Sequence, residues 1–298
     1  MQTLPSWFDH SRYPFEPRTF ATPAGDMHYV DEGAGQPVVC VHGNPDWSFS
    51  YRHVIAGLTG ECRVIACDHI GFGLSDKPGD FDYRVRSHAA NFAAFADHLD
   101  LHRVVLVVND WGGPIALPWA LDHPDRVAGL VLCNTYLWSA KGERLFEAFS
   151  AVMGGPVGRL LIRRANLFAG VLHPLMLRRR ASRRWAVRRH IAEITRNGRQ
   201  RKGQWVFPRE IVESGPWQEE QWARIATLAQ IPTSIVWGAR DPIFRKKECR
   251  HWLAGLPHSE VIKLDDAAHY PHEDRPDAVI AAVRRCLSAE GGSTQRST

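Results

Sequence analysis

One stretch constrains the fold of this chain more than any other: five consecutive aliphatic residues, Val104 to Val108, run directly into Asn109-Asp110-Trp111-Gly112-Gly113. A run of valine and leucine this dense is typical of a strand buried on both faces, as in a parallel sheet covered by helices. The glycines and the helical pattern that follows indicate a tight strand-to-helix turn with Asp110 at its tip. Because an unpaired carboxylate at the end of a buried strand is costly, packing does not explain Asp110. We therefore expect Asp110 to be a nucleophile.

The rest of the chain alternates between strand and helix patterns after an initial hairpin. The hairpin is predicted over residues 18–33, and buried strands follow at 37–41, 63–67, 104–108, 127–133, 233–237 and 261–264. This order predicts an α/β fold with a mostly parallel, eight-stranded sheet flanked by helices. Sites form at the carboxyl ends of such strands, where four polar residues fall: Asn44, Asp110, Asp241 and His269.

The alternation is interrupted by an arginine-rich block. Between Lys141 and Arg209 the sequence has 17 lysines and arginines against three acidic residues, whereas the whole chain carries a net charge of +5. One contiguous basic block in a mildly acidic chain indicates a separate structural unit. We expect a first core segment at residues 1–135, an arginine-rich helical cap inserted at 136–213, a second core segment at 214–287, and a disordered tail at 288–298.

The cysteines and the chain's start bear on location. The six cysteines show no metal-ligand spacing and mostly lie in apolar runs, so we expect buried free thiols in a reducing compartment, with no metal site. The N-terminus lacks the pattern of a signal peptide, and the longest nearly apolar stretch, Leu167 to Leu177, is too short to cross a bilayer. These features predict a cytoplasmic protein. No reading motif accompanies the positive charge, so nucleic-acid binding is not expected.

Three of the strand-end residues form a recognisable series: Asp110, Asp241 and His269. A nucleophile, an acid and a histidine in this order are typical of the α/β-hydrolase fold. A single loop histidine is more often structural than catalytic, but His269 follows the last predicted strand, where this fold places its base. The acid could instead come from the tip after residues 127–133. That tip holds Asn134, which cannot be an anionic partner, so Asp241 is favoured.

Asn44 and Trp111 are candidates for an anion site. In this fold a loop after an early strand donates one oxyanion-hole amide, and the residue after the nucleophile donates the second. These positions are held by Asn44 and Trp111, whose carboxamide and indole N–H groups are donors as well. Taken singly, a turn residue and a core aromatic are ordinary explanations. The two together at the elbow predict halide or oxyanion binding.

Three motifs resemble the haloalkane dehalogenase family: Val41-His42-Gly43-Asn44-Pro45, the glycine-punctuated segment from Asp68 to Pro78, and Asn109-Asp110-Trp111-Gly112-Gly113. The likeness covers about residues 18–135 and 217–287. An Asn–Trp pair with the acid after the later strand is similar to the third subfamily, which is also similar to β-lactone decarboxylases of olefin biosynthesis. The resemblance implies that Asp110 is the nucleophile, His269 the base and Asp241 the acid. It also implies that Asn44 and Trp111 bind the halide.

The resemblance also implies an activity. It is the hydrolysis of carbon–halogen bonds through a covalent alkyl-aspartate ester, which gives an alcohol, a halide ion and a proton without a cofactor. The partners would be a small apolar substrate, either a haloalkane or a lactone, and the halide ion. β-Lactone decarboxylation by the same residues is the alternative.

Three other activities are less well matched. Epoxide hydrolases use two cap tyrosines, and only Tyr136 is eligible because no tyrosine lies between Leu137 and Arg209. Fluoroacetate dehalogenases carry arginines beside the nucleophile, and Trp111-Gly112-Gly113 offers none. The aspartate at position 110 excludes serine-type esterase chemistry.

The cap sequence also indicates an interaction surface. Leu160 to Arg164 and Leu175 to Arg180 pair apolar residues with arginines. Such segments lie on anionic membranes or mediate self-association, so we expect one of these contacts through the basic cap. The alternative is a solvated face on which arginine stems cover apolar surface.

Overall fold

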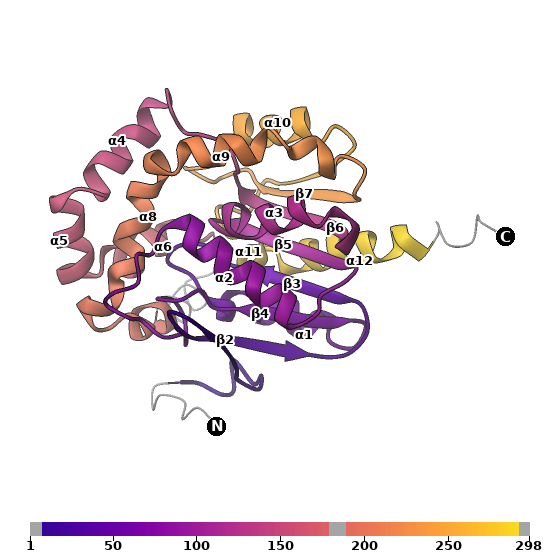
Figure 1. The fold of residues 1–298 in the computed structure, drawn as a ribbon, viewed down its shortest axis with the longest axis horizontal. Coiled ribbons are helices and arrows are strands. Elements are labelled where there is room, and N and C mark those ends of the chain that lie inside the picture. The colour runs from indigo at the N-terminus through magenta and orange to yellow at the C-terminus, as the bar shows by residue number, and fades with distance from the viewer. Residues whose placement is uncertain (1–7, 179–188, 292–298) are drawn as a thin grey trace.

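The computed structural model describes residues 8–178 and 189–291, and within them eight strands form one sheet (Figure 1). Its order is β1-β2-β4-β3-β5-β6-β7-β8. The first hairpin and the pairing of β2 with β4 are antiparallel, and every later pairing is parallel. This confirms the predicted sheet. The strands are β1 (Arg18–Thr22), β2 (Gly25–Glu32), β3 (Pro37–Val41), β4 (Arg63–Cys67), β5 (Val104–Asp110), β6 (Val127–Thr135), β7 (Thr233–Gly238) and β8 (Glu260–Leu264).

Helices cover both faces of the sheet. Successive side chains of a strand point to opposite faces, so Leu106 and Val108 of β5 enter one apolar core and Val105 and Val107 the other. The first core includes residues of α2, α3 and α10, and the second includes residues of α1 and α12. Burial on both sides explains why β5 reads as a continuous apolar run. The helices are α1 (Arg52–Leu58), α2 (Val85–His98), α3 (Gly112–Asp122), α10 (Lys246–Gly255) and α12 (Pro276–Gly291).

Between β6 and β7 the chain forms a group of helices that includes α4 (Arg144–Met153), α5 (Pro156–Ala165), α6 (His173–Leu175) and α8 (Lys202–Glu213). Figure 1 shows α4, α5 and α8 together at one side of the sheet. This is the region predicted to be an arginine-rich cap, and α9 (Gly215–Trp222) then leads back to β7. Arg179 and Arg180, which belong to the second apolar–arginine segment, lie outside the described residues.

Two further findings concern helix lengths. The last helix, α12, continues past Leu287 to Gly291 and so enters the segment expected to be a disordered tail, because Ala289 and Glu290 favour helix. Residues 292–298 are outside the described part of the chain. Within that part, no single helix is both long and apolar enough to cross a bilayer; α4 and α5 reach that length and composition only as a pair, with a bend of 62° between them.

Candidate active site

The turn between β5 and α3 holds Asp110 in a constrained backbone conformation. Asp110 ends β5 with a φ of 52°, which is rare for a residue with a side chain. The Thr135 hydroxyl donates a hydrogen bond to the Asp110 carbonyl oxygen at 2.6 Å. The neighbouring chain approaches closely: a Cβ at Gly43 would lie 2.2 Å from Asp110 Oδ1, and one at Gly113 would lie 2.2 Å from Thr135 Oγ1. The predicted strand-to-helix turn is therefore present, and it presents the Asp110 carboxylate in one orientation.

The two oxygens of the Asp110 carboxylate have different surroundings. The backbone N–H of Asn44 donates to Oδ1 at 2.8 Å. Oδ2 lies 3.5 Å from Nε2 of His269. One oxygen is thus held by a backbone amide, and the other faces the imidazole.

His269 connects Asp110 to Asp241. Its Nδ1 is 2.8 Å from Asp241 Oδ2, and both side chains are buried. Asp241 Oδ1 also accepts a hydrogen bond from the backbone N–H of Ile243 at 2.7 Å. The structure therefore brings Asp110, His269 and Asp241 into one chain of polar contacts, with His269 between the two carboxylates.

The charges around His269 set its protonation. Burial by itself lowers the pKa of this imidazole, but the carboxylates of Asp241 and Asp110 outweigh burial and raise the pKa to about 10. The two neighbouring carboxyl groups therefore favour the protonated form of the ring.

Asn134 and Asn109 also hold the site, and sequence reasoning did not find these roles. Asn134 is buried near the end of β6, and its Nδ2 donates to Asp241 Oδ2 at 2.8 Å while its Oδ1 accepts from the Gly238 N–H at 2.7 Å. Asn109 Nδ2 donates to the His269 carbonyl oxygen at 2.9 Å. The sequence shows that Asn134 cannot be the acid, but it does not predict this supporting role. The sequence signal for this role is the position of Asn134 at the end of a predicted strand, since the next strand in the sheet is followed by Asp241.

A cavity of about 290 Å³ opens in front of Asp110, and Asn44, Trp111 and His269 line it as well. The indole of Trp111 is fixed between two aromatic rings, with centroid distances of 5.3 Å to Tyr136 and 4.8 Å to Phe207. The Asn44 side chain is almost buried, with its Nδ2 3.5 Å from the Gln204 carbonyl oxygen. Asp110 and His269 thus meet this pair at one cavity, and Asp241 contacts His269 without lining the cavity.

The other walls of the cavity are mostly apolar and come from both the sheet and the inserted helices. Aromatic and aliphatic side chains predominate, among them Trp138, Phe146, Phe149, Phe168, Phe244, Ile211 and Met176. Leu145 of α4 lines the cavity and is 58% exposed, so the cavity approaches the surface beside this helix. Such walls suit a small apolar molecule, and a few polar groups, Asp110 and His269 among them, can orient it.

Known proteins with a similar sequence or structure show the fold class of this chain. The family model for the alpha/beta hydrolase fold matches residues 36–276. Among solved structures, a loop variant of the haloalkane dehalogenase DbeA from Bradyrhizobium elkanii is similar, with a TM-score of 0.83, 25% identity, and coverage of 95% of this chain and 99% of that one. The fold is thus that of an α/β hydrolase.

Proteins with similar sequences identify the family within this class. Haloalkane dehalogenase 2 of Mycobacterium tuberculosis (strain ATCC 25618 / H37Rv) is 39% identical over 277 residues, which cover 92% of this chain and 96% of the relative. Cis-3-alkyl-4-alkyloxetan-2-one decarboxylase of Xanthomonas campestris pv. campestris is 35% identical over 299 residues, with coverage of 92% and 97%. The chain belongs to the haloalkane dehalogenase family, and this confirms the resemblance in its motifs. The names of these relatives do not mention self-association or membrane binding. Contact of the basic cap with a second copy or with a membrane therefore stays a prediction.

Proposed function

We propose that this protein hydrolyses carbon–halogen bonds in small apolar haloalkanes, using Asp110 as nucleophile, His269 as base and Asp241 as acid. The observation that carries the proposal is that Asp110 and His269 meet Asn44 and Trp111 at one largely apolar cavity, while Asp241 contacts His269 at 2.8 Å. The dehalogenase relatives support the same activity. The partners are then the haloalkane and the halide ion.

In the first step, Asp110 displaces the halide. Oδ2 attacks the tetrahedral carbon, the carbon–halogen bond breaks, and its electron pair leaves with the halide. The side-chain N–H groups of Asn44 and Trp111 stabilise the departing anion. Because the Asn44 amide holds Oδ1, this atom becomes the carbonyl oxygen of the alkyl ester.

In the second step, water hydrolyses the ester. Esterification removes the negative charge of Asp110, one of the two charges that raise the pKa of His269, so the imidazolium releases its proton to solvent. Neutral His269 then takes a proton from water as the hydroxide adds to the ester carbon, and Asp241 stabilises the new imidazolium. The oxyanion at Oδ1 is held by the backbone amides of Asn44 and Trp111. The alkoxide leaves as the alcohol by taking a proton from His269, which then takes the proton of the regenerated Asp110 carboxyl.

The decisive experiment uses His269→Phe with 1-bromobutane and intact-protein mass spectrometry. We expect one bromide per enzyme and a butyl adduct on Asp110, because the ester forms but is not hydrolysed. The matched control is Asp110→Asn, which should release no bromide and gain no mass. An unmodified His269→Phe protein would refute covalent catalysis.

β-Lactone decarboxylation is the second candidate. Decarboxylases of Shewanella oneidensis and Xanthomonas campestris at 31% and 35% identity support it, and an apolar cavity accommodates an alkyl-substituted lactone. Rapid release of carbon dioxide from a cis-β-lactone, with no bromide from 1-bromobutane, would favour this candidate. Epoxide opening is less well supported: Tyr136 and Tyr270 line the cavity, but Tyr270 directly follows His269 and does not come from the inserted helices.

A cytoplasmic location is part of the same proposal. All six cysteines are free and buried, which suits a reducing compartment. Fractionation of the source cells would test it, and recovery of the protein from the medium would contradict it.

A further inference from the structure

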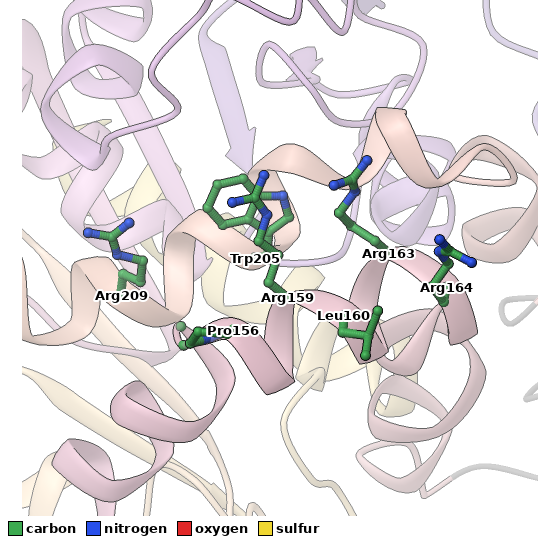
Figure 2. A pocket seen from close by; sticks show the side chains of 9 residues that line it. Pro156, Arg159, Leu160, Arg163, Arg164, Trp205 and Arg209 are labelled. Carbon is green, nitrogen blue, oxygen red and sulfur yellow. The ribbon is translucent and has the colours of Figure 1, made fainter.

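A second hollow, of about 380 Å³, lies on the outside of the inserted helices, between α5 and α8. Four arginines line it: Arg159, Arg163 and Arg164 from α5, and Arg209 from α8. Figure 2 shows the three α5 side chains along this groove, with Arg209 toward its other end. The groove is separate from the cavity at Asp110, since none of its lining residues is shared with that cavity.

The groove carries unbalanced positive charge. The Arg159 guanidinium lies 4.4 Å from the centroid of the Trp205 ring, and Arg209 pairs with Glu213 at 2.6 Å. Arg163 and Arg164 form no ion pair with any residue of 8–178 and 189–291, and no acidic residue lines the groove. Guanidinium groups match the geometry of phosphate oxygens, so a phosphate is the anion that these side chains fit best.

Exposed apolar side chains lie near these arginines on α4 and α5 and are not packed in the core of the protein. On α5 only Gly158 and Ile162 are buried, while Val157 is 64%, Leu160 57% and Leu161 41% exposed. On the adjacent α4, Val152 is 57% exposed. Several exposed aliphatic side chains on two adjacent helices are typical of a place where another surface binds.

We propose that α4 and α5 dock on an anionic phospholipid membrane, with a lipid phosphate in the arginine groove and the apolar side chains at the boundary of the acyl chains. Arginines beside exposed aliphatic residues are typical of helices that lie in the plane of a membrane surface. The composition of α4 and α5, which together reach that of a membrane span, agrees with this placement. A two-fold contact between copies through this face would instead gather the groove arginines of both copies in one interface, and like charges repel.

The docked orientation has a consequence for the proposed reaction. Leu145 of α4 lines the active-site cavity and is exposed on the same helix. Docking through α4 and α5 therefore brings the mouth of the cavity to the membrane, where apolar haloalkanes and lactones concentrate. This consequence rests on the proposed function, but the docking itself does not.

Co-sedimentation with lipid vesicles tests the proposal. Vesicles of phosphatidylcholine mixed with phosphatidylglycerol should pellet the protein at low salt and release it at high salt, whereas phosphatidylcholine alone should not bind. The variant Arg159→Gln/Arg163→Gln/Arg164→Gln should lose affinity on the order of 100-fold, from three basic residues at the surface. The matched control Arg18→Gln/Lys246→Gln/Arg250→Gln removes the same charge from exposed positions outside the groove and should bind like the wild type. An unchanged thermal midpoint shows that each variant is folded.

Four outcomes would overturn the proposal: equal binding to both kinds of vesicle, full binding by the groove variant, equal loss in the control variant, or saturable binding of inorganic phosphate that leaves vesicle binding unchanged. A vesicle-free oligomer in sedimentation velocity that the groove variant dissociates would also overturn it, in favour of an interface between copies. The vesicle results do not depend on catalysis, so a failed bromide assay leaves them interpretable.

Discussion

The imidazole of His269 lies between two carboxylates, with Nδ1 2.8 Å from Asp241 and Nε2 3.5 Å from Asp110. This arrangement couples the proposed chemistry to the stability of the fold. The same charges that hold the proton on the resting enzyme stabilise the folded state whenever His269 is protonated.

The pH dependence of unfolding should show this coupling. The pKa of His269 is raised in the folded state from an ordinary 6.5 to about 10. Its contribution to stability is therefore fully present below pH 6.5 and is lost as the pH rises through about 10. Denaturant unfolding of the wild type and of His269→Phe across this range should give curves that converge as the pH rises; curves that stay parallel would contradict the assignment.

Gly43 offers a steric test of the carboxylate orientation. A Cβ at this position would lie 2.2 Å from Asp110 Oδ1, so Gly43→Ala must displace the carboxylate or the loop. We expect bromide release to fall by about 100-fold, since a shift of about 1 Å at a reacting group has effects of this size. Gly79→Ala is the control, because a Cβ at Gly79 meets nothing within 4 Å. Equal rates for both variants would show that the carboxylate tolerates movement.

At the scale of elements, Asn134 joins the ends of β6 and β7. It contacts Asp241 and Gly238 together, so its loss removes one of the hydrogen bonds that hold the Asp241 carboxylate without removing any group that lines the cavity. Asn134→Ala should lower kcat by about 10-fold to 100-fold, leave KM nearly unchanged and shift the pH profile of kcat, because His269 loses a fixed partner. A change in KM alone, with an unchanged pH profile, would indicate a purely structural role.

Arg201 has a comparable role within the inserted helices. Its buried guanidinium donates to four backbone carbonyls, which are those of Thr195, Ile162, Arg163 and Arg196. Arg201→Ala would remove this donor from all four carbonyls and should lower the free energy of unfolding by about 3 kcal/mol. Hydrogen exchange should increase in α5 and in residues 189–201. The exposed Arg199→Ala should change neither, and protection of α5 in both variants would contradict the role.

The elements differ in how far the sequence predicts them. β5 and β6 are buried on both faces, so their apolar runs identify them, and the fold's rule about strand ends then leads to Asp110, Asp241 and His269. Asn134 and Arg201 are different, because each acts on partners brought near only by the folded chain. The inserted helices mix arginine with exposed aliphatic residues, and such a pattern allows several packings. The end of α12 is not predicted correctly, because the small and polar residues after Leu287 resemble a disordered tail even though they extend the helix to Gly291.

At the scale of the whole molecule, the six cysteines report on the integrity of both cores. All are buried, and burial raises the pKa of Cys62 and Cys286 to about 11 and that of Cys67 and Cys133 further. A thiolate is the reactive form, so the native protein should react slowly with a disulfide reagent at neutral pH, and six thiols should react after denaturation. One fast native thiol would show that a core opens locally.

The hydrogen bond from the Asn44 amide to Oδ1 holds one oxygen atom of Asp110 in place. In the proposed reaction the two oxygen atoms therefore also differ in how long they stay in the protein. In the proposed reaction, the Oδ2 atom leaves with the alcohol and a water oxygen takes its place, whereas the held Oδ1 atom never enters the product. In isotopically labelled water the first alcohol from each enzyme should therefore be unlabelled and every later one labelled. One atom of the nucleophile is renewed from solvent at each turnover, and its neighbour persists for the lifetime of the protein.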